Sequence, residues 1–258
     1  MLQEEHRARH LAWEGCVNAR DLGGLPARDG ATIRRGALVR SECLDRLTET
    51  GRQALLAHGV RTIVDVRLPD EAAGAPYPFM GKRGFLGRRS SDGNAVRYVN
   101  VSFIVPDTYW PTGPISIADD YKRSLDRFAS QVAAIAKAIA DAPEGGVLVH
   151  CAAGKDRTGL VVALLLDLAG VPRDLIAADY ALSSENLRER TLEWIEMVPE
   201  ERAQREEEML RMMSRPETML EVLTHLDESY GSTEGYLLAS GCRPEHLARL
   251  RARLVAEV

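Results

Sequence analysis

Two kinds of hydrophobic pattern alternate along this chain. Short runs of apolar and β-branched residues, typical of buried strands, occupy 61–67, 97–105 and 145–150. Longer segments in which apolar residues recur every three or four positions, typical of amphipathic helices, occupy 44–58, 119–140 and 159–170. Buried strands that alternate with helices predict an α/β fold, with a mostly parallel central sheet flanked by helices.

The other segments predict how the chain is organised. Residues 16–40 combine glycine turns with short apolar pieces, typical of loops with a small hairpin, and 69–95 is a surface excursion rich in Pro, Gly, Arg and Ser. From Asp174 onward the pattern is helical almost throughout. We predict a single domain, 1–258, with a helical C-terminal portion in which 185–230 forms a lid or appendage.

Composition narrows the classes of function. The formal net charge is -5 and 45% of the residues are hydrophobic, which is ordinary for a globular protein and lacks the basic excess of a nucleic-acid-binding one. The four cysteines lie far apart, with no C-x-x-C pair and no clustered histidines, which argues against a zinc site and a disulfide scaffold. We therefore predict no metal and no cofactor, and we expect reduced thiols.

The distribution of apolar residues sets an expectation for location. The segment MLQEEHRARH is too polar for a signal peptide. The longest apolar run, 160–166, is too short to span a bilayer. We expect a cytoplasmic protein without integral membrane association, although export without a cleaved signal stays open. The sequence does not predict the oligomeric state.

The chemically informative segment is HCAAGKDRTG, residues 150–159. A predicted buried strand leads into it and an apolar helix leaves it, so several loop N–H groups can converge where the helix N-terminus adds positive potential. That arrangement is a cradle for an anion. Cys151 lies at its base, and thiols at helix N-termini ionise more readily than free cysteine.

Three further residues complete a phosphoryl-transfer site. Arg157 offers a planar fork that binds two phosphoryl oxygens at once. Gly154 lets the backbone approach the anion with no Cβ in the way, and Thr158 is placed to hydrogen-bond the sulfur when it leaves. Because the transferred group is metaphosphate-like, positioned donors around it supply most of the catalysis. The segment predicts Cys151 as nucleophile and Arg157 as phosphate clamp.

Other accounts of this segment fit less well. A Walker loop requires G-x-x-x-x-G-K-[ST], but the chain has Val149 and Asp156 at two of those positions. An inert buried thiol is the commonest role of a lone cysteine, but it does not explain Gly154, Arg157 and Thr158 at these offsets. A sulfur-transfer or arsenate-reducing loop is a further alternative.

HCAAGKDRTG resembles the active-site motif of the protein tyrosine phosphatase superfamily. In this motif, five residues separate a His-Cys pair from an Arg, which is followed by Thr or Ser. Within it, the chain is similar to a bacterial family typified by the mycobacterial type B phosphatase. NARDLGG at 18–24 matches that family's Asn-x-Arg-Asp-(Leu/Val)-Gly-Gly segment, with Ala19 where an aromatic is usual. Residues 33–71, 159–183 and 229–237 are also family-like, so the resemblance covers most of the chain.

The resemblance implies a three-layer α/β phosphatase fold and hydrolysis of phosphotyrosine, with phosphoserine, phosphothreonine and phosphoinositides as added substrates. The expected partners are thus a phosphoprotein or a phosphoinositide, and no nucleic acid. The residues that would bind the phosphoryl group are Ala152, Ala153, Gly154, Lys155, Asp156, Arg157 and Thr158. A lysine at position 155 is a feature of lipid-acting and promiscuous members. It would add a second cation for multiply phosphorylated head groups; otherwise Lys155 is a solvated loop residue.

The general acid has several candidates. Asp65 lies at the carboxyl end of a predicted parallel strand, where α/β sites gather, and it matches the aspartate of the family's Asp-x-Arg segment. Asp156, inside the loop, is the alternative, either as the acid or to position water. The chain has no Trp-Pro-Asp triplet, so ordinary surface or helix-start carboxylates are the better account of Asp107, Asp119 and Asp120.

The methionine-containing helices between Asn186 and Asp227 resemble the region that forms a helical lid in the mycobacterial relative. A lid would exclude water and protect an oxidisable thiolate, but methionines at helical spacing are also ordinary core residues.

Two other functions stay open. One is a catalytically silent phospho-ligand-binding module, against which the complete set of Cys151, Arg157 and Thr158 argues. The other is a phosphatase dedicated to phosphoinositides or inositol phosphates.

Overall fold

The computed structural model describes residues 8–77, 85–86, 96–105 and 115–256, and its centre is a sheet with the strand order β1-β2-β6-β3-β5-β4. The strands are β1 (Arg20–Asp21), β2 (Leu38–Ser41), β3 (Val60–Asp65), β4 (Phe85–Leu86), β5 (Val96–Asn100) and β6 (Gly146–His150). The inner strands β2, β6, β3 and β5 run parallel, whereas β1 and β4 pair antiparallel at the two edges. The prediction of a mostly parallel sheet is confirmed.

The register of the inner strands brings their carboxyl ends to one edge of the sheet. Ser41 of β2 and Asp65 of β3 both pair with His150, the last residue of β6. The chain segments that follow these three strands therefore start side by side. This is the edge at which parallel α/β sheets bind their ligands.

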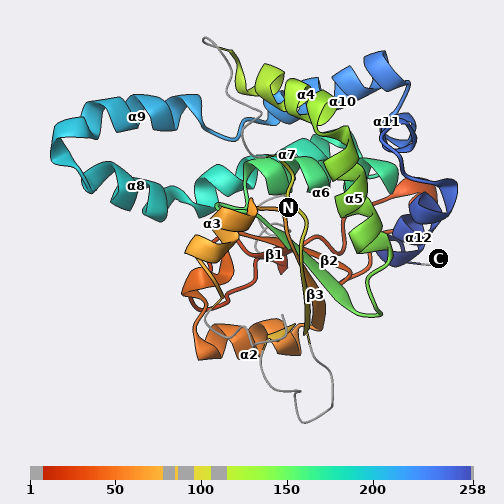
Figure 1. Ribbon diagram of the computed structural model, residues 1–258, viewed down its shortest axis with the longest axis horizontal. Coiled ribbons are helices and arrows are strands. Elements are labelled where there is room, and N and C mark those ends of the chain that lie inside the picture. Colours follow the sequence, from red (N-terminus) through yellow and green to blue (C-terminus); the bar gives the residue numbers. More distant parts are fainter. Residues whose placement is uncertain (1–7, 78–84, 87–95, 106–114, 257–258) are drawn as a thin grey trace.

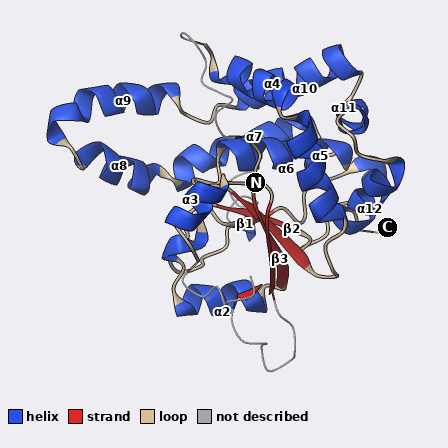
Figure 2. Ribbon diagram, in the orientation of Figure 1, coloured by secondary structure: helices blue, strands red, loops and turns tan. Residues whose placement is uncertain are grey.

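Helices cover both faces of the sheet (Figure 1, Figure 2). The α-helices are α2 (Glu49–Ala57), α3 (Pro69–Gly74), α4 (Ile117–Arg127), α5 (Ala129–Ala140), α6 (Asp156–Leu168), α7 (Arg173–Asn186), α8 (Arg188–Glu196), α9 (Arg202–Arg211), α10 (Pro216–Tyr230), α11 (Thr233–Ala239) and α12 (Pro244–Leu254). Short 3-10 turns are η1 (Arg28–Gly30), η2 (Leu44–Arg46) and η3 (Pro199–Glu201). Among the described residues, no helix combines the length and apolar character that crossing a bilayer requires.

Each face of the sheet has its own hydrophobic core, because successive residues of a strand point to opposite faces. Val39, Ile63 and Leu148 pack on one face with Leu55 of α2. Val64 and its neighbours on the other face pack against α5, α6, α7, α10 and α12. Figure 1 shows α2 on one side of the strands and α5, α6 and α7 on the other. The predicted three-layer fold is confirmed.

Two of the predicted helices are interrupted. Segment 44–58 begins with the 3-10 turn η2, and α2 starts only after Thr48, whose side chain accepts the Gly51 N–H. Segment 119–140 is divided into α4 and α5 by Phe128, whose φ of -105° and ψ of 27° leave the helical region. Since apolar residues keep the three- and four-residue spacing on both sides of Phe128, the pattern does not reveal this break.

The predicted C-terminal helical portion divides into two parts. Helix α10 packs into the core through residues such as Met219 and Leu223. Helices α8 and α9, joined by η3, extend away from the rest of the molecule (Figure 2), and we call them the helical arm. Met197, just after α8, is 74% exposed, whereas Met219 is fully buried. The methionines of this region therefore include both core residues and exposed ones.

Candidate active site

The cysteine loop, residues 151–155, connects β6 to α6 at the edge where the parallel strands end. Cys151 is buried at the base of this loop, with 3% of its surface exposed, whereas the neighbouring Ala152 is exposed. Helix α6, of 13 residues, begins at Asp156, with Lys155 as its N-cap residue. The positive end of the α6 dipole therefore lies at the loop and favours an anion there.

Gly154 is required by the path of the loop, but for a different reason from the one expected. Its φ is +68°, and a Cβ at this position would lie 2.2 Å from the carbonyl oxygen of Ser41 and 2.5 Å from the nitrogen of Glu42. Side chains rarely adopt this φ, and both contacts are with backbone. The glycine therefore makes room for the backbone that follows β2, not for the anion.

Three carbonyl groups of the cysteine loop are held from outside. They accept hydrogen bonds from residues between 18 and 43: Ala152 from the Cys43 N–H (2.7 Å), Ala153 from Asn18 Nδ2 (2.9 Å), and Gly154 from Arg40 Nη2 (2.8 Å) and, at 3.4 Å, from Asn18 Nδ2. In a trans peptide the N–H points away from the C=O, so the N–H groups of these peptides face the inside of the loop. Within the described part of the chain they donate to no other group. Inward-facing amides of this kind form an anion cradle.

A buried ion network holds Asn18 and Arg40 in place. Asp179 of α7 is fully buried and accepts hydrogen bonds from Arg9 at 2.9 Å, Arg20 at 3.1 Å and Arg40 at 2.9 Å. Arg20 also donates to the side-chain oxygen of Asn18 at 2.6 Å. Three guanidinium groups share one carboxylate, so this group of four side chains keeps an excess of positive charge behind the loop.

Arg157 is oriented by a bidentate ion pair. Its Nη1 and Nη2 donate to the carboxylate of Glu71 in α3 at 2.6 and 2.8 Å. The other guanidinium N–H groups have no acceptor among the described residues and can bind a phosphoryl group. Burial would lower the pKa of Arg157, but Glu71 and the nearby Cys151 outweigh it and raise this pKa above its usual value. Arg157 therefore stays a cation in the first turn of α6, directly after the cysteine loop.

Comparisons with known proteins identify the family. A model of the tyrosine phosphatase family matches residues 11–256. The chain belongs to this family. The phosphatase is 31% identical over 239 residues to a tyrosine-protein phosphatase of Nostoc commune. This alignment covers 89% of this chain and 78% of the relative. It is 30% identical over 278 residues to the triple specificity protein phosphatase PtpB of Mycobacterium tuberculosis. That alignment covers 93% of this chain and 97% of the relative. The predicted family and enzyme class, a protein-tyrosine phosphatase, are thus confirmed.

Asp65, the first predicted general acid, is buried in the phosphatase and fixed by hydrogen bonds. Asp65 is fully buried and accepts hydrogen bonds from Arg67 at 2.7 Å and from the Tyr98 hydroxyl at 2.8 Å. Burial alone would raise the pKa of Asp65, but His150 and the Arg67 guanidinium outweigh it and hold this pKa below its usual value. A buried, ionised carboxylate has neither a proton to donate nor access to a substrate. These contacts argue against Asp65 as the acid.

Asp156, the alternative acid, lies in the first turn of α6 and is accessible, with 36% of its side chain exposed. Its Oδ1 accepts hydrogen bonds from the Tyr121 hydroxyl and from Lys155 Nζ, the latter at 2.7 Å. Lys155 Nζ also donates to the carbonyl of Met212 at the end of the helical arm, at 2.8 Å. Lys155 is 8% exposed, so it is not a solvated residue on the rim of the loop.

The remaining predicted carboxylates differ in their surroundings. Asp107 lies outside the described residues. Asp119 is exposed and caps α4 together with Ser116, as an ordinary helix-start carboxylate would. Burial and the nearby Asp156 raise the pKa of Asp120, whose buried Oδ1 has no hydrogen-bond partner among the described residues. In the described part of the chain, no cluster of His, Cys, Asp or Glu has the arrangement of a metal site.

The other three cysteines, Cys16, Cys43 and Cys242, are buried free thiols. Burial raises the pKa of Cys16 and of Cys43 to about 12 and also raises that of Cys242, so these three are neutral. The hydroxyl of Thr158 is buried and has no partner among the described residues. The predicted hydrogen bond from Thr158 to the Cys151 sulfur therefore stays a prediction.

Sequence reasoning missed several residues that shape this site. Glu71 and Arg40 drew no attention, because each acts on a loop residue more than eighty positions away. Asn18 was noted as part of the NARDLGG segment, but without a role. A signal existed for Asn18, Arg40 and Glu71, since all three lie in segments that resemble the phosphatase family. Tyr121, which holds Asp156, had no such signal.

Replacing Glu71 by glutamine tests whether this carboxylate positions Arg157 or blocks it. Positioning predicts a roughly 10-fold lower kcat/KM on a phosphotyrosyl peptide, about 1.4 kcal/mol, because the fork loses its orientation. Asp70→Asn, which changes an exposed acid on the same helix, is the matched control and should leave kcat/KM unchanged. A rise in kcat/KM for Glu71→Gln would show instead that the carboxylate competes with substrate.

Proposed function

We propose that the phosphatase hydrolyses phosphotyrosine in proteins through a phosphocysteine formed on Cys151. The observation that carries this proposal is the cysteine loop itself. Its carbonyls at Ala152, Ala153 and Gly154 are held outward, its N–H groups face inward, and Arg157 follows it in the first turn of α6. Such a cradle stabilises the equatorial oxygens of a transferring phosphoryl group.

The reaction has two displacements at phosphorus. In the first, the Cys151 thiolate forms a P–S bond while the P–O bond to tyrosine breaks, and the leaving oxygen takes a proton from Asp156. In the second, water forms a P–O bond while the P–S bond breaks, and the Asp156 carboxylate takes the proton of that water. Inorganic phosphate and the thiolate are regenerated. Arg157 holds two phosphoryl oxygens throughout.

Asp156 suits the acid and base role because of how its two oxygens are used. Tyr121 and Lys155 both bind Oδ1. Burial and Asp156 raise the pKa of Tyr121 well above its usual value, so this hydroxyl stays a neutral donor. Oδ2 accepts no hydrogen bond from any described residue and is available to the leaving oxygen or to water. Asp65, by contrast, is better assigned to structure, since it fixes Arg67 and Tyr98.

Asp156→Asn should make the rate depend steeply on the leaving group. An alkoxide from serine needs protonation more than a phenolate does, so we expect a loss of roughly 10²–10⁴-fold on phosphoserine and a smaller loss on aryl phosphates with acidic phenols. Comparing kcat across a series of aryl phosphates measures this dependence. Asp65→Asn is the counterpart, and we expect it to lower the melting temperature without changing that slope. If Asp65→Asn made the rate depend more steeply on the leaving group and Asp156→Asn did not, Asp65 would be the acid.

A broader substrate range is a second proposal. The name of the Mycobacterium tuberculosis relative refers to triple specificity, and we propose added activity on phosphoserine and phosphothreonine. Activity on phosphoinositides has less support, because Lys155, the expected second cation, is already bound to Asp156 and to the Met212 carbonyl. The same contact supports the proposal that the helical arm acts as a lid, since it ties the end of α9 to the cysteine loop.

A further inference from the structure

A cavity of about 490 Å³ lies between the cysteine loop and the helical arm. Ala152 lines it on the loop side, Glu71 lines it from α3, and Trp194 and Met197 line it from the end of α8. Binding pockets for small ligands have volumes of about 300–1,000 Å³. Since Glu71 holds Arg157 and Ala152 adjoins Cys151, the cavity begins where a group bonded to the phosphoryl oxygen would leave the loop.

Trp194 and Met197 give the arm side of this cavity an apolar surface. The guanidinium of Arg205 in α9 stacks on the Trp194 ring, 4.9 Å from its centroid, and holds the ring in place from within the arm. Met197 is 74% exposed, although it is a large apolar side chain. An aromatic ligand ring gains from packing on a fixed indole and on a flexible thioether. These two residues therefore have the chemistry of an aryl-binding wall.

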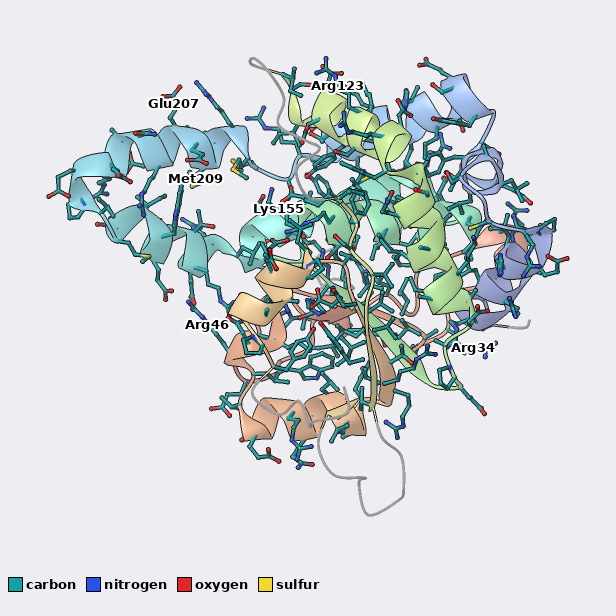
Figure 3. All side chains as sticks on the ribbon, viewed as in Figure 1. Arg34, Arg46, Arg123, Lys155, Glu207 and Met209 are labelled. Carbon is teal, nitrogen blue, oxygen red and sulfur yellow. The ribbon has the colours of Figure 1, made fainter. Side chains whose placement is uncertain are left out.

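The charges around the cavity do not favour a polyanion. Of the described residues, equal numbers of cations and anions line it: Arg46, Arg67 and Arg190 with Asp45, Glu71 and Glu193. Two of the arginines are already paired with buried acids, Arg67 with Asp65 at 2.7 Å and Arg190 with Glu42 at 3.3 Å. The third, Arg46, is exposed, lies beneath the arm (Figure 3) and has the Glu193 carboxylate 4.0 Å away. A multiply phosphorylated inositol would gain little here, whereas an uncharged ring does not need a net charge.

We infer that this cavity receives the aromatic ring and the adjoining peptide of a phosphotyrosyl substrate, with Trp194 and Met197 as the residues that favour it over a phosphoinositide head group. The inference rests on the proposed function and names the substrate class of the same site. With the phosphoryl group on the cysteine loop, the ring passes the exposed Ala152 and packs on the arm. The volume beyond the ring accommodates a neighbouring residue of the peptide.

Binding measurements on a variant that does not turn over its ligand test this inference. Isothermal titration of Cys151→Ser with a phosphotyrosyl peptide is compared with the same variant that also carries Trp194→Ala and Met197→Ala. We expect peptide affinity to fall about 10-fold or more, because the ring loses its stacking partners. The affinities for inorganic phosphate and for inositol 1,3-bisphosphate should not change. Leu192→Ala, which removes an exposed side chain of α8 outside the cavity, is the control and should have no effect.

Three outcomes would overturn the inference. Unchanged peptide affinity would show that the ring lies elsewhere. An equal loss of affinity for inositol 1,3-bisphosphate, with inorganic phosphate binding unchanged, would show that the cavity binds the phosphoinositide head group. Weaker binding of inorganic phosphate would show that the arm acts through the cysteine loop and not through the ring. Failure of the proposed function would appear separately, as wild-type protein that does not hydrolyse the peptide.

Discussion

Cys151→Ser is expected to lower kcat on a phosphotyrosyl peptide on the order of 10⁴-fold or more, while inorganic phosphate and vanadate still bind. A serine hydroxyl at neutral pH is protonated and is a far weaker nucleophile than a thiolate. The inward N–H groups and Arg157 are unchanged by this substitution, so the anion cradle persists. Steady-state kinetics together with phosphate titration separates the loss of chemistry from the loss of binding.

Cys242→Ser provides the matched control for this change. Cys242 is also buried, and burial raises the pKa of its thiol, so it is a neutral side chain remote from the cysteine loop. Its sulfur lies 3.8 Å from the carbonyl of Ala133, an acceptor that a serine hydroxyl can also use. We expect kcat close to wild type. Substantial turnover by Cys151→Ser would refute nucleophilic catalysis by this cysteine.

Asp179→Asn is expected to lower the free energy of unfolding by about 3–5 kcal/mol, because it leaves three buried guanidinium groups without their shared anion. Arg9, Arg20 and Arg40 are each within 3.1 Å of this carboxylate. Denaturant titration measures the change. Phosphate affinity should fall as well, since Arg40 holds the Gly154 carbonyl. A loss below 1 kcal/mol would contradict the assignment of this network as the support of the loop.

The pH dependence of stability gives the same network a second signature. Burial alone would raise the pKa of Asp179, but the surrounding arginines outweigh it and hold this pKa well below its usual value of about 3.9. The stability that Asp179 contributes is therefore present above about pH 4 and is lost as the pH falls toward its folded-state pKa. The difference between wild type and Asp179→Asn should shrink in acid. Glu207 lies on the helical arm (Figure 3), and Glu207→Gln, which breaks an exposed pair with Arg211, should barely change stability at any pH.

The features that sequence reasoning predicted well are local ones. The strands β3 and β6 stand out as short β-branched runs, and the segment from His150 to Gly159 carries its cysteine, its arginine and its helix start within ten consecutive positions. Each of these depends on neighbours along the chain. The break at Phe128 was missed because the apolar spacing of α4 and α5 is continuous, and only packing in the core shows where the chain turns.

The parts of the site that sequence reasoning missed depend on contacts between distant segments. Asp65 is at the predicted strand end, but the direction of its side chain is set by Arg67 and by Tyr98 on another strand. The sequence position of Asp65 does not reveal these contacts. Glu71 likewise meets Arg157 only because β3 and β6 end side by side. A motif names the reactive groups, whereas the register of the sheet determines which charges surround them.

Rapid acid quenching of the wild-type enzyme during turnover of a phosphotyrosyl peptide, followed by mass spectrometry of its fragments, tests the central mechanism most directly. We predict a phosphorylated fragment that contains Cys151, formed before steady state and absent from Cys151→Ser. Turnover with no phosphorylated enzyme at any time, or with the phosphoryl group on another residue, would contradict it.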